Sequence, residues 1–399
     1  MTGLATDLLH QLLKRRTDNE AERTILRVLA TVETEQLNEM LADPWLTDRL
    51  VGSMDDRWFG PDHHTELMSL LGVTRRAELG LPARAAFIHA VQTGRTDARD
   101  ERIVAALFCD VKGADLTVLK SLVDATPNHN DLEELIYRDI DDQRVRDQIL
   151  AHIAAEALHV NGLEAKVLSD IDDTTICSLH DKRYPKGVVY PGVLALWEAL
   201  DQGPQGKPRS LGDLTFITAR PADLLGWVED QTRRKLRGAG VGVNSMLTGS
   251  LTHLLSHSGM ADKKIQNITH YHHLYPEYRL VFIGDSGQGD VTVGERLRAE
   301  FSDAVDAVLI HDVVDTDAVT RARHASAGVV FFDTYVAAAL EVRRIGLISD
   351  AGLQSVADAT VEGFADVPWR DEAQEARARG LLQADLNRLD AERGQADPG

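Results

Sequence analysis

Cysteine is nearly absent from this 399-residue chain, which holds only Cys109 and Cys177. Two thiols are too few for a disulfide framework, so a reducing compartment is the better setting. Long apolar runs are missing as well, because the richest stretches, 103–109 and 329–342, are short or broken by Asp and Thr. Residues 1–7 lack the basic and apolar segments of a secretory signal. We therefore expect a cytoplasmic protein without a transmembrane segment.

An excess of positive charge is also lacking. The chain carries 43 basic and 63 acidic residues, which give a formal net charge of −20. Such a chain repels nucleic acid and anionic lipid unless basic residues are concentrated locally. Two candidate patches, one at Lys182, Arg183 and Lys186 and one at 233–237, are interpreted as solvated loop or helix faces. The charge therefore argues against nucleic-acid binding and leaves a small phosphorylated substrate open.

The length of the chain and the spacing of its apolar residues predict more than one domain. Its length exceeds what one compact core usually serves, so two domains are expected. Leucines at helical spacing between Leu8 and Leu13 open a region that predicts an all-helical domain over residues 1–160. Two stretches within it, 50–71 and 132–153, share an acidic pair followed by an apolar helix. This internal match indicates a duplicated helical unit.

A different pattern begins at Lys166. Helical stretches separate five short apolar runs that stop at polar residues: 167–168, 214–217, 280–283, 308–310 and 328–332. Strands that alternate with helices predict a parallel sheet covered on both faces. Ligands of such sheets bind beyond the carboxyl ends of the strands. We expect an α/β domain over residues 161–350, followed by a C-terminal helix and a flexible tail over 351–399.

Three polar motifs directly follow predicted strands. Residues 169–174, Ser-Asp-Ile-Asp-Asp-Thr, crowd three carboxylates together, which fits either a divalent cation site or an ordinary acidic turn. Residues 218–221, Thr-Ala-Arg-Pro, can hold a phosphate oxygen, although a plain helix N-cap explains them equally simply. In residues 284–290, Gly-Asp-Ser-Gly-Gln-Gly-Asp, glycines let the backbone bend while two carboxylates face one pocket. A lysine, Lys263 or Lys264, precedes this third motif and gains meaning only from the other three elements.

In this order and spacing, the four elements resemble the haloacid dehalogenase superfamily of phosphohydrolases. The likeness is closer to one branch, the actin-patch-type phosphatidate phosphatase catalytic domain, and runs over about residues 166–348. Further along, His-Asp-Val at 311–313 and Phe-Phe-Asp-Thr-Tyr-Val at 331–336 continue it. The resemblance implies a Rossmann-like α/β core, and it leaves the N-terminal half unassigned. Within that half, residues 94–149 have a faint similarity to an annexin-type helical repeat, without the rest of its calcium pattern.

The resemblance also implies a mechanism and assigns roles to individual residues. Asp170 would attack phosphorus, and Asp172 would act as the general acid and then the general base. Mg²⁺, with no organic cofactor, would be held by Asp170, by Asp172 through its backbone carbonyl, and by Asp285, with Asp290 behind them. Thr218, Ala219 and a lysine would bind the phosphate oxygens. The spacing to Ile268 favours Lys264 over Lys263 in that last role.

Three functions are weighed on this basis. The first is a phosphatase acting on a phosphatidate-like lipid, with peripheral contact to a membrane. The second keeps the chemistry but acts on a soluble phosphate ester or a phosphoprotein, which the charge of −20 and the missing anchor favour. In the third, the helical half is a membrane- or protein-docking module, and the phosphatase-like domain is a non-catalytic scaffold. The full set of motif residues argues against that third function.

Overall fold

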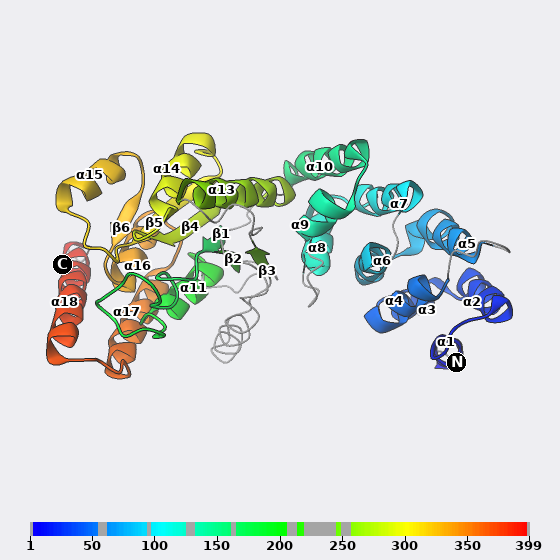
Figure 1. The fold of residues 1–399 in the computed structure, drawn as a ribbon, viewed down its shortest axis with the longest axis horizontal. Helices are drawn as coiled ribbons and strands as arrows, with labels where there is room; N and C mark the ends of the chain where they lie inside the picture. Colours follow the sequence, from blue (N-terminus) through cyan, green and yellow to red (C-terminus); the bar gives the residue numbers. More distant parts are fainter. Residues whose placement is uncertain are drawn as a thin grey trace. The chain divides into compact units, whose positions relative to one another are not determined.

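The computed structural model describes residues 3–54, 62–93, 97–124, 132–160, 165–205, 214–218, 245–248 and 257–396 (Figure 1). For 214–218, 245–248, 257–260 and 395–396 it describes the backbone alone. The chain divides into two compact units. The first comprises residues 1–161 and 273–277, and the second comprises residues 162–272 and 278–399.

Every element of the first unit in the described ranges is helical, as the leucine spacing predicts. Its α-helices are α1 (Gly3–Leu13), α2 (Asn19–Thr31), α3 (Thr34–Leu41), α4 (Pro44–Ser53), α5 (His63–Ser69), α6 (Leu81–Thr93), α7 (Ala98–Cys109), α8 (Gly113–Asp124), α9 (Leu132–Glu134) and α10 (Gln143–Ala157). A π-helical turn at Leu70–Thr74 follows α5, and another at Leu135–Asp139 follows α9. Acidic side chains cap several starts: Asp18 accepts backbone N–H bonds at α2, and Asp97 forms a capping box with Asp100 at α7.

Helix α6 lies at the centre of this unit. All ten residues from Ala83 to Gln92 are buried, so the helix is enclosed on every side by its neighbours. A buried ion pair also belongs to the unit, since Lys120 Nζ on α8 lies 2.7 Å from Glu277 Oε1 and both side chains are 1% exposed. The short segment 273–277 is therefore fixed to α8 by charge as well as by packing.

The second unit is built on a six-stranded parallel sheet in the order β3-β2-β1-β4-β5-β6. The strands are β1 (Lys166–Ser169), β2 (Leu214–Thr218), β3 (Ser245–Thr248), β4 (Leu280–Asp285), β5 (Val305–His311) and β6 (Val330–Phe332). The helices are α11 (Val193–Gln202), α13 (His257–Leu274), α14 (Asp290–Glu300), α15 (Ala318–Ser326), α16 (Tyr335–Arg344), α17 (Asp350–Ala365) and α18 (Glu372–Ala396). The predicted fold class, a helical region followed by a parallel α/β core, is confirmed.

Helices cover both faces of the sheet, with α13 and α14 on one face and α11, α16 and α17 on the other (Figure 1). Every residue of β1 and β4 is buried, which agrees with the apolar residues at 167–168 and 280–283. The two C-terminal helices join the same core, because Leu353 and Phe364 of α17 and Leu382 of α18 belong to the buried cluster that includes Trp197 of α11.

The register of the two central strands determines where the polar motifs meet. Leu168 lies beside Phe282 and Ser169 beside Ile283, so the residues that follow each strand emerge at the same edge. The chain leaves β1 toward β2 and β3 on one side and returns at β4 on the other. The point between β1 and β4 is thus the topological switch point, where ligands of parallel sheets bind. In the ranges described, no helix is both long and apolar enough to cross a bilayer.

Candidate active site

Asp170 is the first residue after β1, and it is held in place by the neighbouring strand. Its backbone N–H donates to the carbonyl of Ile283 at 2.9 Å, which extends the pairing of β1 with β4 by one step. The hydroxyls of Ser169 and Thr175 both donate to the Asp170 carbonyl at 3.0 Å. The backbone at this residue is therefore fixed from both sides, and the side chain is buried.

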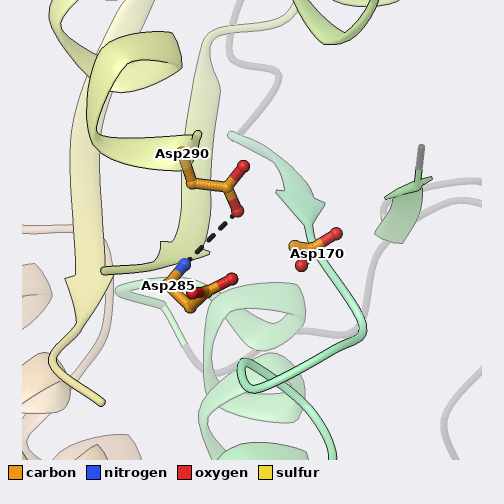
Figure 2. A group of neighbouring side chains, drawn as sticks. All are labelled: Asp170, Asp285 and Asp290. Atoms are coloured by element: carbon orange, nitrogen blue, oxygen red, sulfur yellow. Dashed lines mark hydrogen bonds between the residues drawn. The ribbon is translucent and has the colours of Figure 1, made fainter. Parts of the chain in front are cut away.

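Two further carboxylates come from the end of β4 and the start of α14. Asp285 Oδ1 accepts the backbone N–H of Gly287 at 2.6 Å, and Asp290 Oδ2 accepts the N–H of Asp285 at 3.3 Å. Figure 2 shows the three side chains, with Asp170 reaching the group from β1. One oxygen from each of Asp170, Asp285 and Asp290 lies within 4.8 Å of the other two, and all three residues are buried.

A single ammonium joins this carboxylate group. Lys264 of α13 is buried, and its Nζ lies 2.5 Å from Asp290 Oδ1 and 3.1 Å from Asp170 Oδ1. Its neighbour Lys263 is half-buried and donates to Gln266 Oε1 at 3.0 Å instead. Of the two lysines that the sequence offers, the structure thus places Lys264 against the carboxylates.

The charges of the group do not balance. Burial raises the pKa of Asp170 to about 7, with Lys264 lowering it and Asp290 raising it further. Burial and the negative charge of Asp290 likewise raise the pKa of Asp285 well above its usual range. The pKa of Lys264 is raised by Asp170 and Asp290 although burial alone would lower it. One ammonium cannot neutralise three carboxylates, so the group has an unmet demand for positive charge.

The site also contains a buried carboxylate oxygen that has no hydrogen-bond partner among the described residues. This oxygen is Asp170 Oδ2. Buried polar atoms without a partner are costly and are rare in folded proteins. Three clustered carboxylates, an excess of negative charge and an unpartnered oxygen fit a hard divalent cation. The residues present are therefore suited to hold one.

The loop after β1 turns sharply at Asp173, which adopts a left-handed backbone with φ of 54°. The Asp173 carboxylate supports this turn, because it accepts backbone N–H bonds from Ser178, Leu179 and His180 at 2.5–3.0 Å. The Asp172 carboxylate accepts the Ser178 hydroxyl at 2.6 Å and is not part of the three-carboxylate group. Of the three crowded acids, Asp173 thus shapes the loop.

His311, at the end of β5, contacts the backbone of the same loop. Its Nδ1 lies 2.8 Å from the Asp173 carbonyl, and its Nε2 lies 2.9 Å from Arg183 Nη2. A guanidinium can only donate, so Nε2 is the acceptor and Nδ1 carries the proton that reaches the carbonyl. Burial, with Arg183 adding to it, lowers the pKa of His311 to about 4. The imidazole is therefore neutral and bridges two parts of the site.

Arg183 was predicted to lie on a solvated face, and that prediction is wrong. The side chain is buried, and its Nη2 lies 2.9 Å from Asp181 Oδ2. Asp181 also accepts the Tyr190 hydroxyl at 3.0 Å, so the buried charge has both an ionic partner and a fixed position. Lys182 and Lys186, in contrast, are exposed as expected. Sequence alone offers one signal for Arg183, an acid two residues earlier.

A second support fixes the loop after β4. The Ser286 hydroxyl donates to Asp312 Oδ1 at 2.9 Å and accepts the Val313 N–H at the same distance. Arg321 of α15 pairs with Asp312 and also with Asp333, whose Oδ1 lies 2.7 Å from its Nη2. Ser286 directly follows Asp285, so this network holds the backbone that carries a site carboxylate. Asp312 and Arg321 were not among the predicted site residues.

The remaining predicted positions are only partly described. Thr218 ends β2, where its backbone pairs with Thr248, but its side chain lies outside the described residues. Ala219 lies outside them altogether. Thr174 is buried in the loop, and its carbonyl accepts the Tyr335 hydroxyl at 2.5 Å. This hydrogen bond fixes the backbone of the loop at Thr174.

Comparison with known families confirms the resemblance for part of the chain. Residues 165–312 match the family model described as phosphatidate phosphatase APP1, catalytic domain. The match spans less than half of the 399 residues, but it includes all four members of the group formed by Asp170, Lys264, Asp285 and Asp290. No significant match was found among curated proteins or solved structures. Residues 1–164 lie outside the matched segment, so the duplicated helical unit and the annexin-type likeness stay predictions.

Proposed function

We propose that this chain is a magnesium-dependent phosphatase that hydrolyses a phosphate monoester through a phosphoryl group carried on Asp170. The observation that supports it most is the buried group of three carboxylates and one ammonium at the switch point of the sheet. That group lies inside the segment that matches a phosphatidate phosphatase catalytic domain. Buried acids with raised pKa values cluster at catalytic sites more often than elsewhere.

Asp170, Asp285 and Asp290 are the residues proposed to hold the metal, with the Asp172 carbonyl as a further ligand. Oxygen ligands and an excess of negative charge suit Mg²⁺. When bound, the ion supplies positive charge that stabilises the phosphoryl group during transfer. The chain contributes Lys264 as a second, fixed positive charge on the same group.

Asp170 is the proposed nucleophile. Its Oδ1 faces Lys264, whereas its Oδ2 is buried and has no hydrogen-bond partner within the described residues. In the first step, an Asp170 carboxylate oxygen forms a bond to phosphorus while the bond from phosphorus to the ester oxygen breaks. A water molecule then attacks phosphorus, which releases inorganic phosphate and restores the carboxylate.

Asp172 is the proposed acid and base. It lies two residues beyond Asp170, and the hydrogen bond from the Ser178 hydroxyl orients its carboxylate. In the first step it would give a proton to the departing ester oxygen, and in the second it would take one from the attacking water. The proton count closes over the two steps, so no further proton donor is needed.

The substrate is proposed from the family match, which favours a phosphatidate-like lipid. Lys264, the Thr218 hydroxyl and the Ala219 amide are proposed to bind the phosphate oxygens. A soluble phosphate ester or a phosphoprotein would present the same group to the site. The choice among these therefore depends on what surrounds the phosphate.

Phosphate release by the purified full chain tests the proposal. It is measured with Mg²⁺ against phosphatidate vesicles, soluble phosphate esters and phosphopeptides, with Asp170→Asn and an EDTA-treated sample in parallel. We expect Mg²⁺-dependent release that Asp170→Asn and EDTA abolish, with phosphatidate preferred. No release from any substrate by folded, Mg²⁺-bound protein would overturn the proposal. Equal release by Asp170→Asn would contradict the role of that residue.

A further inference from the structure

A pocket of about 610 Å³ lies in the helical unit, apart from the carboxylate group of the sheet. The end of α1, the connection that follows it and α4 form its lining. The lining combines Leu13 and Trp45 with Arg15, Arg16 and Arg49. Concave sites with a few convergent polar groups are where proteins bind small ligands.

Positive charge dominates this lining. Among the described residues that line it, the charged ones are three arginines and one acid, Asp48, in a chain whose net charge is −20. In the described part of the chain, no carboxylate forms an ion pair with Arg15 or Arg49, and both side chains are exposed. Guanidinium groups present a planar set of donors that matches phosphate and carboxylate oxygens. These side chains make the pocket suited to an anion.

Asp48 offers a second kind of contact. Its Oδ1 is buried and has no hydrogen-bond partner within the described residues, so an acceptor remains to be satisfied. Burial raises the pKa of Asp48, and His89 works against that rise. A hydroxyl on the ligand can donate to this carboxyl.

Exposed apolar side chains on α1 and α4, the two helices that contribute to the pocket lining, indicate what kind of molecule carries the anion. Trp45 is 42% exposed and stacks on His10 of α1 with ring centroids 5.0 Å apart. On the same helix Leu4 and Leu8, four residues apart and so on one face, are 75% and 37% exposed. A tryptophan and exposed leucines next to arginines are typical of surfaces that contact the headgroup region of a membrane.

We propose that this pocket binds a phosphate ester, held by Arg15, Arg16 and Arg49, with lipid headgroups as its main source. The proposal goes beyond the phosphatase reaction and does not depend on it. It assigns to the helical unit a second phosphate-binding site, distinct in its residues from Asp170 and Lys264. Bound there, a headgroup would hold the chain on a surface that contains anionic lipid.

The test uses the full chain with Asp170→Asn, in EDTA, so that lipid is not consumed. Flotation with phosphatidylcholine vesicles, with and without phosphatidate, measures lipid binding. Calorimetry with glycerol 3-phosphate, which carries both a phosphate and hydroxyls, measures binding of a soluble ester. The test variant is Arg15→Gln with Arg49→Gln, and the matched control is Arg23→Gln with Arg27→Gln. The control pair lies on α2 outside the pocket, is exposed and removes the same charge.

We expect the test variant to lose at least about tenfold in affinity for phosphatidate vesicles, while the control pair keeps it. Loss confined to vesicles identifies a lipid headgroup, and parallel loss for glycerol 3-phosphate identifies the phosphate ester in either setting. Equal binding by the test variant and its parent, or equal loss in the control pair, would overturn the proposal. Phosphate release from a soluble ester by the wild-type chain reports separately on the catalytic site.

Discussion

Lys264 Nζ lies 3.1 Å from Asp170 Oδ1, so the ammonium of the group is within hydrogen-bonding distance of the proposed nucleophile. This contact follows from the register of the sheet and from the burial of α13 against it. The lysine comes 94 positions after the aspartate in the sequence, and only the fold brings them together. Several consequences of this relationship are open to measurement.

Replacing Lys264 with Met should lower phosphate release by at least about 100-fold, because a fixed positive charge on the phosphoryl group would be lost. Lys263→Met is the matched control, since Lys263 lies on the same helix and donates a hydrogen bond to Gln266 instead of the carboxylates. The control should retain its activity. Steady-state phosphate release of the two variants decides the matter, and comparable losses in both would contradict the assignment of Lys264.

Magnesium should stabilise the fold. An ion that binds only the folded state adds about 2.7 kcal/mol when its free concentration is about 100 times its Kd. Asp285→Asn should remove most of this gain, whereas Asp303→Asn, an exposed site with the same charge change, should keep it. Thermal unfolding with Mg²⁺ and with EDTA measures the effect. The same Mg²⁺-dependent gain in Asp285→Asn would exclude Asp285 as a ligand.

Gly284→Ala tests how closely the site is packed. A Cβ at this position would lie 2.5 Å from Asp290 Oδ2 and 2.6 Å from Asp290 Cβ, so the aspartate must move. A displacement of about 1 Å in a catalytic group can cost about 100-fold in rate, and we expect a loss of that order. Gly380→Ala is the control, because a Cβ there meets nothing within 4 Å. Full activity of Gly284→Ala would show that the position of Asp290 is not critical.

His311 should make stability depend on pH. The folded-state pKa of about 4 lies below the ordinary value of 6.5, so the unfolded chain binds this proton first as the pH falls. Stability from this group is complete above pH 6.5 and decreases down to about pH 4, by up to about 3 kcal/mol. Urea unfolding between these values should show a smaller slope in His311→Gln than in the wild type. Identical slopes would mean that His311 does not titrate on unfolding.

The sequence predicts most of the sheet and the meeting of its motifs. Apolar runs mark β1, β2, β4, β5 and β6, and β1 and β4, at the centre of the sheet, are buried along their whole length. The short strand β3 (Ser245–Thr248) was not predicted, since two of its four residues are polar and it lies at the edge of the sheet. The convergence of Asp170 and Asp285 followed from their places after two strands of one parallel sheet.

The residues that hold the site in place could not be predicted from the local sequence pattern. Arg183 reads as a solvated residue, and its burial depends on His311, which is 128 positions away. Asp173 is one of three crowded acids in the sequence, and its left-handed backbone and its bonds to the N–H groups of its own loop appear only in the structure. Such roles depend on contacts between distant segments, which spacing within one segment cannot reveal. Family resemblance named the residues proposed to react, and the structure adds the residues that hold them.

The most direct test of the proposed chemistry is to trap the phosphoryl group on Asp170. The full chain is mixed with Mg²⁺ and its preferred substrate from the panel, quenched in acid within milliseconds and digested for mass spectrometry. The account predicts a peptide containing Asp170 that is heavier by one phosphoryl group, and its absence from Asp170→Asn. Mg²⁺-dependent turnover with no phosphoryl group on that peptide at any quench time would contradict the account. A phosphoryl group on another residue would contradict it as well.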